Sequence, residues 1–216
     1  MILTDSSYAK KITCIKYTFL AIALSIMTGC KNNAVSEMEF KAYINNPENG
    51  LIQKKEIEGT QVSLTFIPGE IFLQQELQNH SDWSSIAVDS IRTIYANRLC
   101  FALDLSKDNR EIEASFINNR NAYNQVLQYL NREIGEQIKL IMPSDTLPVT
   151  GSVYPRMFNT TNHSRIILIF DTRKVKLDED FKIEITDSQL GLGVVSFPFK
   201  MDNLKAIPSL KLLDEN

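Results

Sequence analysis

The sequence is short of the residues that most often carry chemistry. Its 216 residues include only two histidines and three cysteines, and no apolar run approaches the ~20 residues needed to cross a bilayer. The formal net charge is -3, so there is no overall basic excess of the kind that neutralises nucleic-acid phosphates. These shortages argue against a multi-span membrane protein and against a nucleic-acid-binding protein.

What the sequence does contain is an ordinary globular composition. Hydrophobic residues make up 44% of the chain and charged residues 23%, which is typical of folded soluble domains. This balance excludes a disordered chain and a collagen-like repeat. The length suits one large domain or two small ones, and no internal repeat or low-complexity linker divides the chain.

The first thirty residues have the successive parts of an export signal. Lys10, Lys11 and Lys16 form a positively charged start, and the apolar run 19–27 follows. That run is too short to cross a bilayer core, which needs ~20 residues, but it has the length of the apolar centre of a signal peptide. We therefore expect the N-terminus to direct export rather than to form part of the fold.

The apolar run ends in Met27-Thr28-Gly29-Cys30, where small residues precede a cysteine. This stretch resembles the lipobox of bacterial lipoproteins, which is Leu, a small residue, Gly or Ala, then Cys; Met27 stands where Leu is commonest. The resemblance implies that residues 1–29 are removed as a signal peptide and that the Cys30 thiol receives a diacylglyceryl group. An ordinary signal peptide with a chance cysteine is the alternative.

Cleavage after residue 29 would leave one cysteine in the folded part. Cys14 leaves with the signal peptide and Cys30 is acylated, so only Cys100 remains and no intramolecular disulfide can form. Cys100 lies in the apolar run 98–103, which predicts a buried strand. A nucleophilic thiol needs a histidine or a positive field nearby, so we expect Cys100 to be an inert core residue.

Alternation of apolar and polar residues predicts a fold rich in strands. Residues 52–57 and 61–67 are joined by a glycine-containing connection, which predicts a β-hairpin. The apolar stripe through Val126 and Leu130 predicts a helix over 122–134. Further strands are expected at 99–105, 138–142, 149–158, 166–170, 181–185 and 194–199, and further helices at 70–78 and 84–95.

These elements predict an α+β domain with a mainly antiparallel sheet and two or three helices, and a β-sandwich decorated by helices is the alternative. The continuous apolar run 166–170 predicts a central strand covered on both faces, and Pro198 predicts an edge strand. The expected organisation is a signal peptide over 1–29, an acylated tether over 30–39 and a single globular domain over 40–216. The tether can run into a helix through Phe40 and Tyr43.

No local motif nominates a catalytic centre. His80 and His163 lie in polar segments typical of the surface, no residues have the local spacing of a zinc site, and no Gly-x-Ser-x-Gly elbow is present. We therefore expect no cofactor and no metal. A triad assembled from distant positions stays open, because its members need not be neighbours in sequence.

Aromatic residues give the only indication of ligand binding. Trp83 lies in a polar segment, where its ring can stack on a sugar or contact a partner, or else fold back onto the core. Tyr154 and Phe158, near Arg156, can line a polar and aromatic groove, with strand packing as the alternative. The candidate ligand-binding residues are therefore Trp83, Tyr154 and Arg156.

The mature part is similar to the small envelope lipoproteins that bacteria of the Bacteroides and Flavobacterium group encode in number. The similarity rests on the strand-rich layout, on the ending Ile207-Pro208 and on the segment Asn46-Pro47-Glu48-Asn49-Gly50-Leu51. It implies a cell-envelope location, with the outer membrane first, and it carries over no functional residue. Such proteins often reach the cell surface through an acidic stretch after the cysteine. The corresponding stretch here is Lys31-Asn32-Asn33-Ala34, which contains no acidic residue. The periplasmic face of a membrane and the cell surface are therefore both possible locations.

Two functions of different classes follow from these observations. We prefer a non-enzymatic binding or assembly module that is held at the membrane by Cys30 and that contacts an envelope protein or a glycan. The alternative is an envelope hydrolase whose site is assembled from distant residues, around His163 or His80.

Replacing Cys30 by serine tests the lipid anchor. Serine lacks the thiol that receives the diacylglyceryl group, so Cys30→Ser should accumulate as unprocessed or unlipidated protein. Cell fractionation with intact-mass measurement checks this. Cys14→Ser is the matched control, because it lies in the expected signal peptide and should leave processing unchanged. Recovery of Cys30→Ser in membranes at the mature mass would contradict the prediction.

Overall fold

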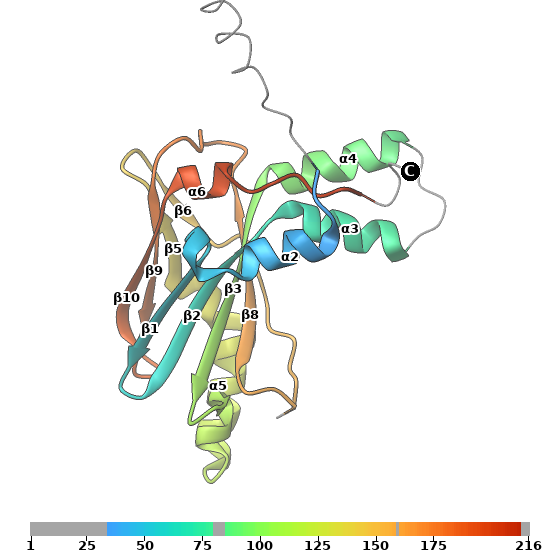
Figure 1. Cartoon of the computed structure of the whole chain (residues 1–216). Coiled ribbons are helices and arrows are strands. Elements are labelled where there is room, and N and C mark those ends of the chain that lie inside the picture. The colour runs from blue at the N-terminus through green and yellow to red at the C-terminus, as the bar shows by residue number, and fades with distance from the viewer. Residues whose placement is uncertain (1–33, 80–84, 159, 213–216) are drawn as a thin grey trace, which may run out of the picture. The chain divides into compact units, whose positions relative to one another are not determined.

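Along most strands of the domain, apolar side chains that point inward alternate with polar side chains that point outward. The inward side chains form the hydrophobic core. The computed structural model describes residues 34–79, 85–158 and 160–212 (Figure 1). Cys30, His80 and Trp83 therefore lie outside the described residues. The core residues all fall within the unit Ala34–Asn216, so a chain that begins at residue 31 retains this core.

The first sheet has six strands, all paired antiparallel. Its order is β1-β2-β3-β8-β7, with β4 paired to β3 off this path. Leu64, Leu103 and Ile166 lie opposite one another on three adjacent strands, and all three are fully buried. The strands are β1 (Ile52–Ile57), β2 (Thr60–Ile67), β3 (Arg98–Lys107), β4 (Arg110–Glu111), β7 (Gly151–Val153) and β8 (Ser164–Asp171).

The second sheet has four antiparallel strands in the order β10-β9-β5-β6. Leu140, Ile183 and Phe197 form a fully buried row across it, in the same way as the row in the first sheet. The strands are β5 (Ile138–Ile141), β6 (Thr146–Pro148), β9 (Phe181–Asp187) and β10 (Gly193–Phe199).

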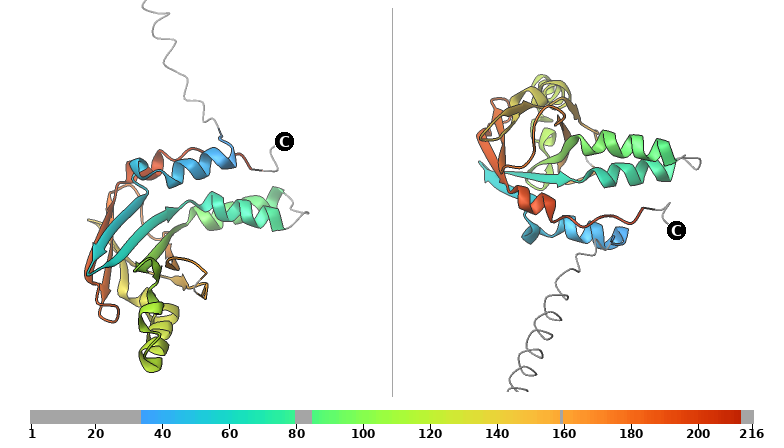
Figure 2. Two further views of the ribbon diagram at one scale, coloured as in Figure 1. Left: turned by 60° about the horizontal axis from the view of Figure 1, so that its bottom comes forward. Right: turned by 90° about the horizontal axis from the view of Figure 1, so that it is seen from above.

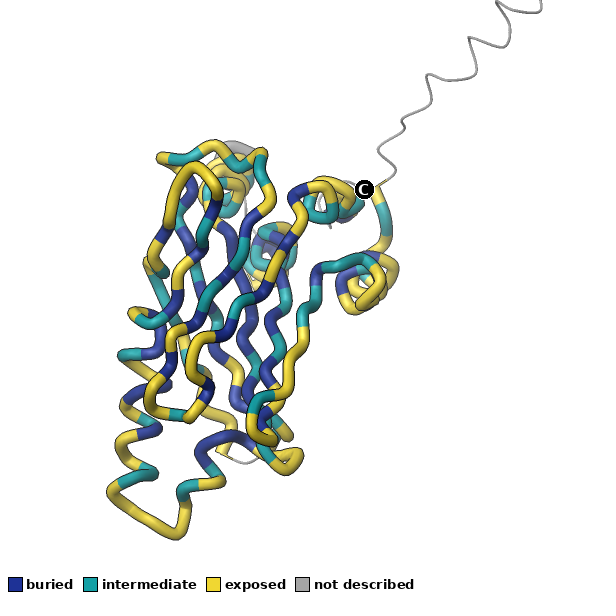
Figure 3. The backbone as a smooth tube through the Cα atoms, turned by 90° about the vertical axis from the view of Figure 1, so that its left-hand side faces the viewer, coloured by how far each residue is buried: buried dark blue, intermediate teal, exposed yellow. Residues whose placement is uncertain are grey.

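The two sheets meet through a cluster of phenylalanine rings centred on Phe101. This ring of the first sheet lies 6.2 Å from Phe181 and 5.1 Å from Phe199 of the second sheet, both edge-to-face. It also contacts Phe66 and Phe170 of its own sheet at 5.4 and 6.0 Å. Burying each such ring contributes about 1.5–3 kcal/mol, so the cluster is a main source of stability. Figure 3 shows the resulting alternation of buried and exposed positions along the strands.

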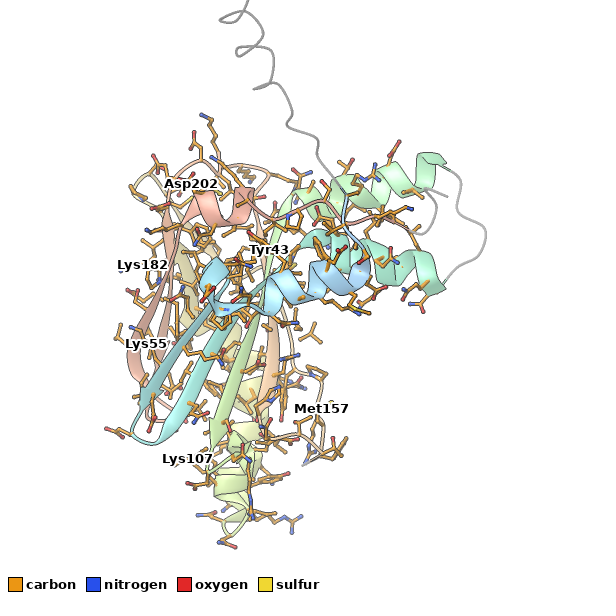
Figure 4. The ribbon with its side chains drawn as sticks, viewed as in Figure 1. Tyr43, Lys55, Lys107, Met157, Lys182 and Asp202 are labelled. Carbon is orange, nitrogen blue, oxygen red and sulfur yellow. The ribbon has the colours of Figure 1, made fainter. Side chains whose placement is uncertain are left out.

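Along one side, β1 of the first sheet lies beside β10 of the second. The ammonium of Lys55 on β1 lies 5.7 Å from the centre of the Phe197 ring on β10, so its alkyl stem covers the edge of the core (Figure 4). The two sheets are therefore closely associated at this edge as well as across the core.

Helices lie at the ends of the sheets. α3 (Gly69–Asn79) and α4 (Ser85–Ala96) form an antiparallel hairpin that projects from the ends of β2 and β3, and α2 (Glu37–Asn45) and α6 (Met201–Lys205) lie at the same end (Figures 1 and 2). α5 (Arg120–Gln128) lies toward the other end and continues as a π-helical turn, Tyr129–Glu133. Short 3-10 turns occupy Pro47–Asn49, Ile112–Phe116 and Ile134–Gln137.

The α+β class predicted from the sequence is confirmed. The strands form two facing sheets rather than one, so the arrangement also has the packing expected of the sandwich alternative. The described residues hold five α-helices, more than the two or three expected. The helix expected at 122–134 is α-helical only to Gln128. α6 was not expected, because five residues are too few to show helical periodicity.

The folded domain begins earlier than the sequence analysis placed it. The Val35 N–H donates to the carbonyl of Ser209 at 2.9 Å, and the Lys211 N–H donates to the carbonyl of Val35 at 2.9 Å. Directly afterwards, Ser36 and Glu39 form a capping box that starts α2. Residues 35–39, assigned to the tether, therefore belong to the fold. A serine followed three positions later by a glutamate is the sequence pattern of a capping box, and the sequence analysis did not use it.

Two finer expectations have different outcomes. β10 is an edge strand of its sheet, which confirms the position predicted from Pro198. The run 166–170 lies on an interior strand, β8, but Ile166, Leu168 and Phe170 are buried while Ile167 and Ile169 are only half-buried. The expectation of full cover on both faces was wrong, because apolar residues on the outward face are only partly covered by neighbouring side chains. The strand expected over 149–158 covers only Gly151–Val153.

Shortening Phe101 tests the joint between the sheets. Phe101→Ala removes the ring contacts to both sheets and should lower the free energy of unfolding by about 3–5 kcal/mol. Urea denaturation of the chain beginning at residue 31 measures this. Met38→Ala is the control, because Met38 is 82% exposed and should change stability by no more than about 0.5 kcal/mol. Equal effects of the two substitutions would contradict the role given to Phe101.

Candidate functional site

A cavity of about 630 Å³ opens between the α3–α4 hairpin and the C-terminal segment 204–212. We call it the helical groove. Phe66 at the end of β2 and Leu99 at the start of β3 form its floor, and Leu73 of α3 and Tyr95 of α4 line one wall. Figure 2 shows that α2 and the C-terminal segment run side by side, opposite the α3–α4 hairpin.

The hairpin wall depends on a close approach between its helices. A Cβ added to Gly69 would lie 2.9 Å from the Cβ of Tyr95, so only glycine fits at the start of α3 without displacing α4. The Tyr95 ring stacks on Phe72 at 5.4 Å, and its hydroxyl donates to Glu76 at 3.5 Å. Burial and the neighbouring Glu76 carboxylate raise the pKa of Tyr95, so its hydroxyl stays protonated at neutral pH. These contacts hold the base of the hairpin at the groove.

The opposite wall is held by the start of the domain. Val35 and Leu210 form a parallel bridge, so the residues just after the N-terminal segment support the C-terminal segment directly. Leu210 and Leu212 are buried, and both line the groove together with Leu204 and Ile207. Residues from the two ends of the described chain thus build one wall together.

The groove has apolar walls and charged groups among its lining residues. Arg92, Arg98 and Glu70 line it, so the charged lining residues carry one net positive charge. Arg92 pairs with Asp89 at 3.2 Å, but both side chains are more than half exposed, and such pairs are weak. Arg98 begins β3 and is exposed. Polar and apolar atoms contribute to the lining of the groove in about equal measure.

The structure separates two of the residues that the sequence analysis grouped. Tyr154 is half-buried and its hydroxyl donates to the Glu113 carboxylate; burial and this hydrogen bond raise the pKa of Tyr154. Arg156 is exposed and donates to the Tyr123 hydroxyl, with its guanidinium 4.6 Å from the Phe158 ring centre. Tyr154 is thus bonded to the buried Glu113, whereas Arg156 contacts Tyr123 and Phe158 at the surface.

Two buried glutamates were missed by the sequence analysis. Glu111 and Glu113 are each 1% exposed. Glu113 accepts hydrogen bonds from Tyr154 and Ser164, and Glu111 accepts one from the Thr161 hydroxyl at 3.0 Å. Buried carboxylates need such donors, and these hold the turn Ile112–Phe116 against β8. Because the donors lie about 40 to 50 residues away in sequence, no local pattern marks the cluster.

His163 lies in a polar recess of about 550 Å³ on the outward face of the first sheet. Its Nε2 lies 3.6 Å from Asp104, and its Nδ1 lies 2.8 Å from the side-chain oxygen of Asn162. Asp104 also accepts two hydrogen bonds from Arg165, at 2.7 and 2.8 Å. Within the described residues neither ring nitrogen of His163 is hydrogen-bonded to a serine hydroxyl, the contact that a hydrolase base makes with its nucleophile. The other candidate base, His80, lies outside the described residues.

Cys100 is buried, as the sequence predicted. Burial raises the pKa of its thiol to about 11, so the reactive thiolate is scarce at neutral pH. The described part of the chain contains no cluster of three or more residues able to ligate a metal ion. Nor does any helix in that part have the length and apolarity needed to cross a membrane.

Comparisons with known proteins give little guidance. No family model and no curated protein matches the chain. Among solved structures, the chain is similar to the crystal structure of a DUF4426 family protein from Pseudomonas aeruginosa PAO1, at 7% identity over 69% of this chain and 92% of that one, with a TM-score of 0.33. A likeness this weak carries no argument about fold or function.

Removing the Tyr154 hydroxyl tests the buried glutamate cluster. Tyr154→Phe takes one donor from the buried Glu113 and should lower the free energy of unfolding by about 1–3 kcal/mol. Tyr123→Phe is the matched control, because it removes only an exposed contact with Arg156 and should change stability by about 0.5 kcal/mol or less. Urea denaturation measures both, and an unchanged stability in Tyr154→Phe would contradict the assignment.

Proposed function

We propose that the protein is a cell-envelope lipoprotein that is anchored to a membrane through an acylated Cys30 and that binds a ligand in its helical groove. The binding is non-enzymatic. This proposal joins the lipobox pattern of the sequence to the position of the groove in the folded domain.

The observation that carries the proposal is the shortness of the link between Cys30 and the fold. Val35 is already hydrogen-bonded to Ser209 and Lys211, so only residues 31–34 separate it from Cys30. An extended chain advances about 3.3–3.6 Å per residue, which limits the distance from Cys30 to Val35 to about 18 Å. Ala34 lines the helical groove. An acylated Cys30 would therefore keep the groove close to the membrane surface.

The lipid anchor would hold firmly. Each buried CH₂ of an acyl chain contributes about 0.8 kcal/mol, and one chain alone gives only marginal binding, so the several chains of a lipoprotein are needed for stable anchoring. A short tether also leaves the domain little freedom to move away from the bilayer. A ligand of the groove would thus come from the membrane or from its immediate surroundings.

Several features support binding rather than catalysis. The volume of the groove lies within the range of about 300–1,000 Å³ that is common for small-molecule sites. Its charged lining residues are two arginines and one glutamate, a set that favours holding an anionic group over acid–base chemistry. Within the described residues, His163 makes no hydrogen bond to a serine hydroxyl, and the Cys100 thiol is buried.

Photo-crosslinking in cells tests whether the groove is occupied in the envelope. A photoreactive residue in place of Ile207, which lines the groove, should give a defined adduct in the wild-type background. The yield of that adduct should fall when Cys30→Ser removes the anchor. The same residue in place of Lys54, on the outward face of the first sheet, should not give this adduct. Absence of any adduct at position 207, or an adduct independent of the anchor, would contradict the proposal.

A further inference from the structure

We infer that the ligand of the helical groove is an anionic amphiphile: an acyl chain that lies along the apolar walls beneath a carboxylate or phosphate held by Arg92 and Arg98. This inference deepens the proposed function by naming the chemical class of the ligand, and it rests on the groove being the binding site. Three features of the groove support it independently.

The interior of the groove suits a hydrocarbon chain. Phe66, Leu73 and Leu99 present their side chains from the sheet ends and the hairpin, and Leu210 and Leu212 present theirs from the C-terminal segment. These five side chains are buried, and Leu204, Ile207 and Pro208, which are half-buried, add apolar surface that a ligand can contact. Moving CH₂ groups from water onto this surface is favourable, so an acyl chain gains affinity with each carbon that it buries.

The charges at the groove select the head group. Arg92 and Arg98 line it with Glu70 as the only acidic residue, in a chain whose net charge is -3. Each arginine also has an acidic neighbour outside the lining, because Asp89 pairs with Arg92 and Asp171 lies opposite Arg98 on β8. Guanidinium groups bind carboxylates and phosphates through paired hydrogen bonds, so these arginines favour an anionic head over a neutral or cationic one.

Arg92 and Arg98 are placed to reach such a head group. Arg92 lies on α4, Arg98 begins β3 two residues after that helix ends, and both line the groove. The pair of Arg92 with Asp89 is exposed and weak, so an anion at the groove can compete for this guanidinium.

The position of the groove in the chain identifies where such a ligand comes from. Ala34 lines the groove, and the expected acylation site lies only four positions before it. A membrane surface at that distance supplies molecules that combine an acyl chain with an anionic head. We therefore assign the groove to a single-chain lipid, either a free fatty acid or a lysophospholipid.

Calorimetric titration of the chain beginning at residue 31 tests the inference without the anchor. The probes are palmitate, lysophosphatidylglycerol and the neutral monopalmitoylglycerol, each below its critical micelle concentration. We expect one molecule of an anionic probe to bind per chain, at least about tenfold more tightly than the neutral probe. Palmitate and lysophosphatidylglycerol distinguish a fatty acid from a phospholipid as the natural source.

Substitutions separate the two parts of the site. Arg92→Gln and Arg98→Gln should each weaken binding of the anionic probes about tenfold while leaving the neutral probe unaffected. Ala96→Trp, which fills the groove from α4, should weaken binding of every probe. Arg120→Gln is the matched control, because Arg120 is an exposed arginine on α5 at the other end of the domain. Urea denaturation confirms that each variant is folded.

The possible outcomes are distinct. Equal affinity for the neutral and anionic probes would overturn the assignment of the arginines, and no binding of any probe would overturn the ligand class. Binding that Ala96→Trp leaves unchanged would show that the lipid lies elsewhere on the domain and would overturn the site. None of these results depends on acylation, which the fractionation of Cys30→Ser decides separately.

Discussion

The rest of the structure depends on the burial of Phe101 between the two sheets. This ring touches Phe66 and Phe170 in its own sheet and Phe181 and Phe199 in the other, so it sets how the sheets face each other. β2 and β3 are central neighbours in the first sheet, and the positions of their ends follow from this packing. The α3–α4 hairpin connects those two ends, so their positions determine where this wall of the helical groove lies.

The groove also depends on the two ends of the domain. Val35 supports the C-terminal segment through backbone hydrogen bonds to Ser209 and Lys211, and that segment forms the second wall. A residue close to the proposed anchor thus contributes to the shape of the proposed binding site.

Much of the sheet structure was predictable, because alternation within a strand is local. The hairpin of β1 and β2, the strand around Cys100 and the edge position of Pro198 all followed from a few adjacent residues. The start of α2 was also readable from Ser36 and Glu39, although the tether was placed over it. The partners of Tyr154 and Arg156 were not readable from the sequence, because Glu113 and Tyr123 lie far from them along the chain.

Local sequence accounts for the pattern of strands and for the class of the fold, and the case for an anchor at Cys30 rests on the sequence alone. The cavity lined by Ala34, Arg92, Arg98 and Leu212 and the burial of Glu111 and Glu113 arise only in the folded chain. The difference lies in the range of the interactions. Strands and helix caps arise from interactions between residues a few positions apart, whereas a cavity arises where segments far apart in sequence fail to fill the space between them. No periodicity in the sequence predicts such a cavity, because its position depends on how the sheets pack and on where their strands end.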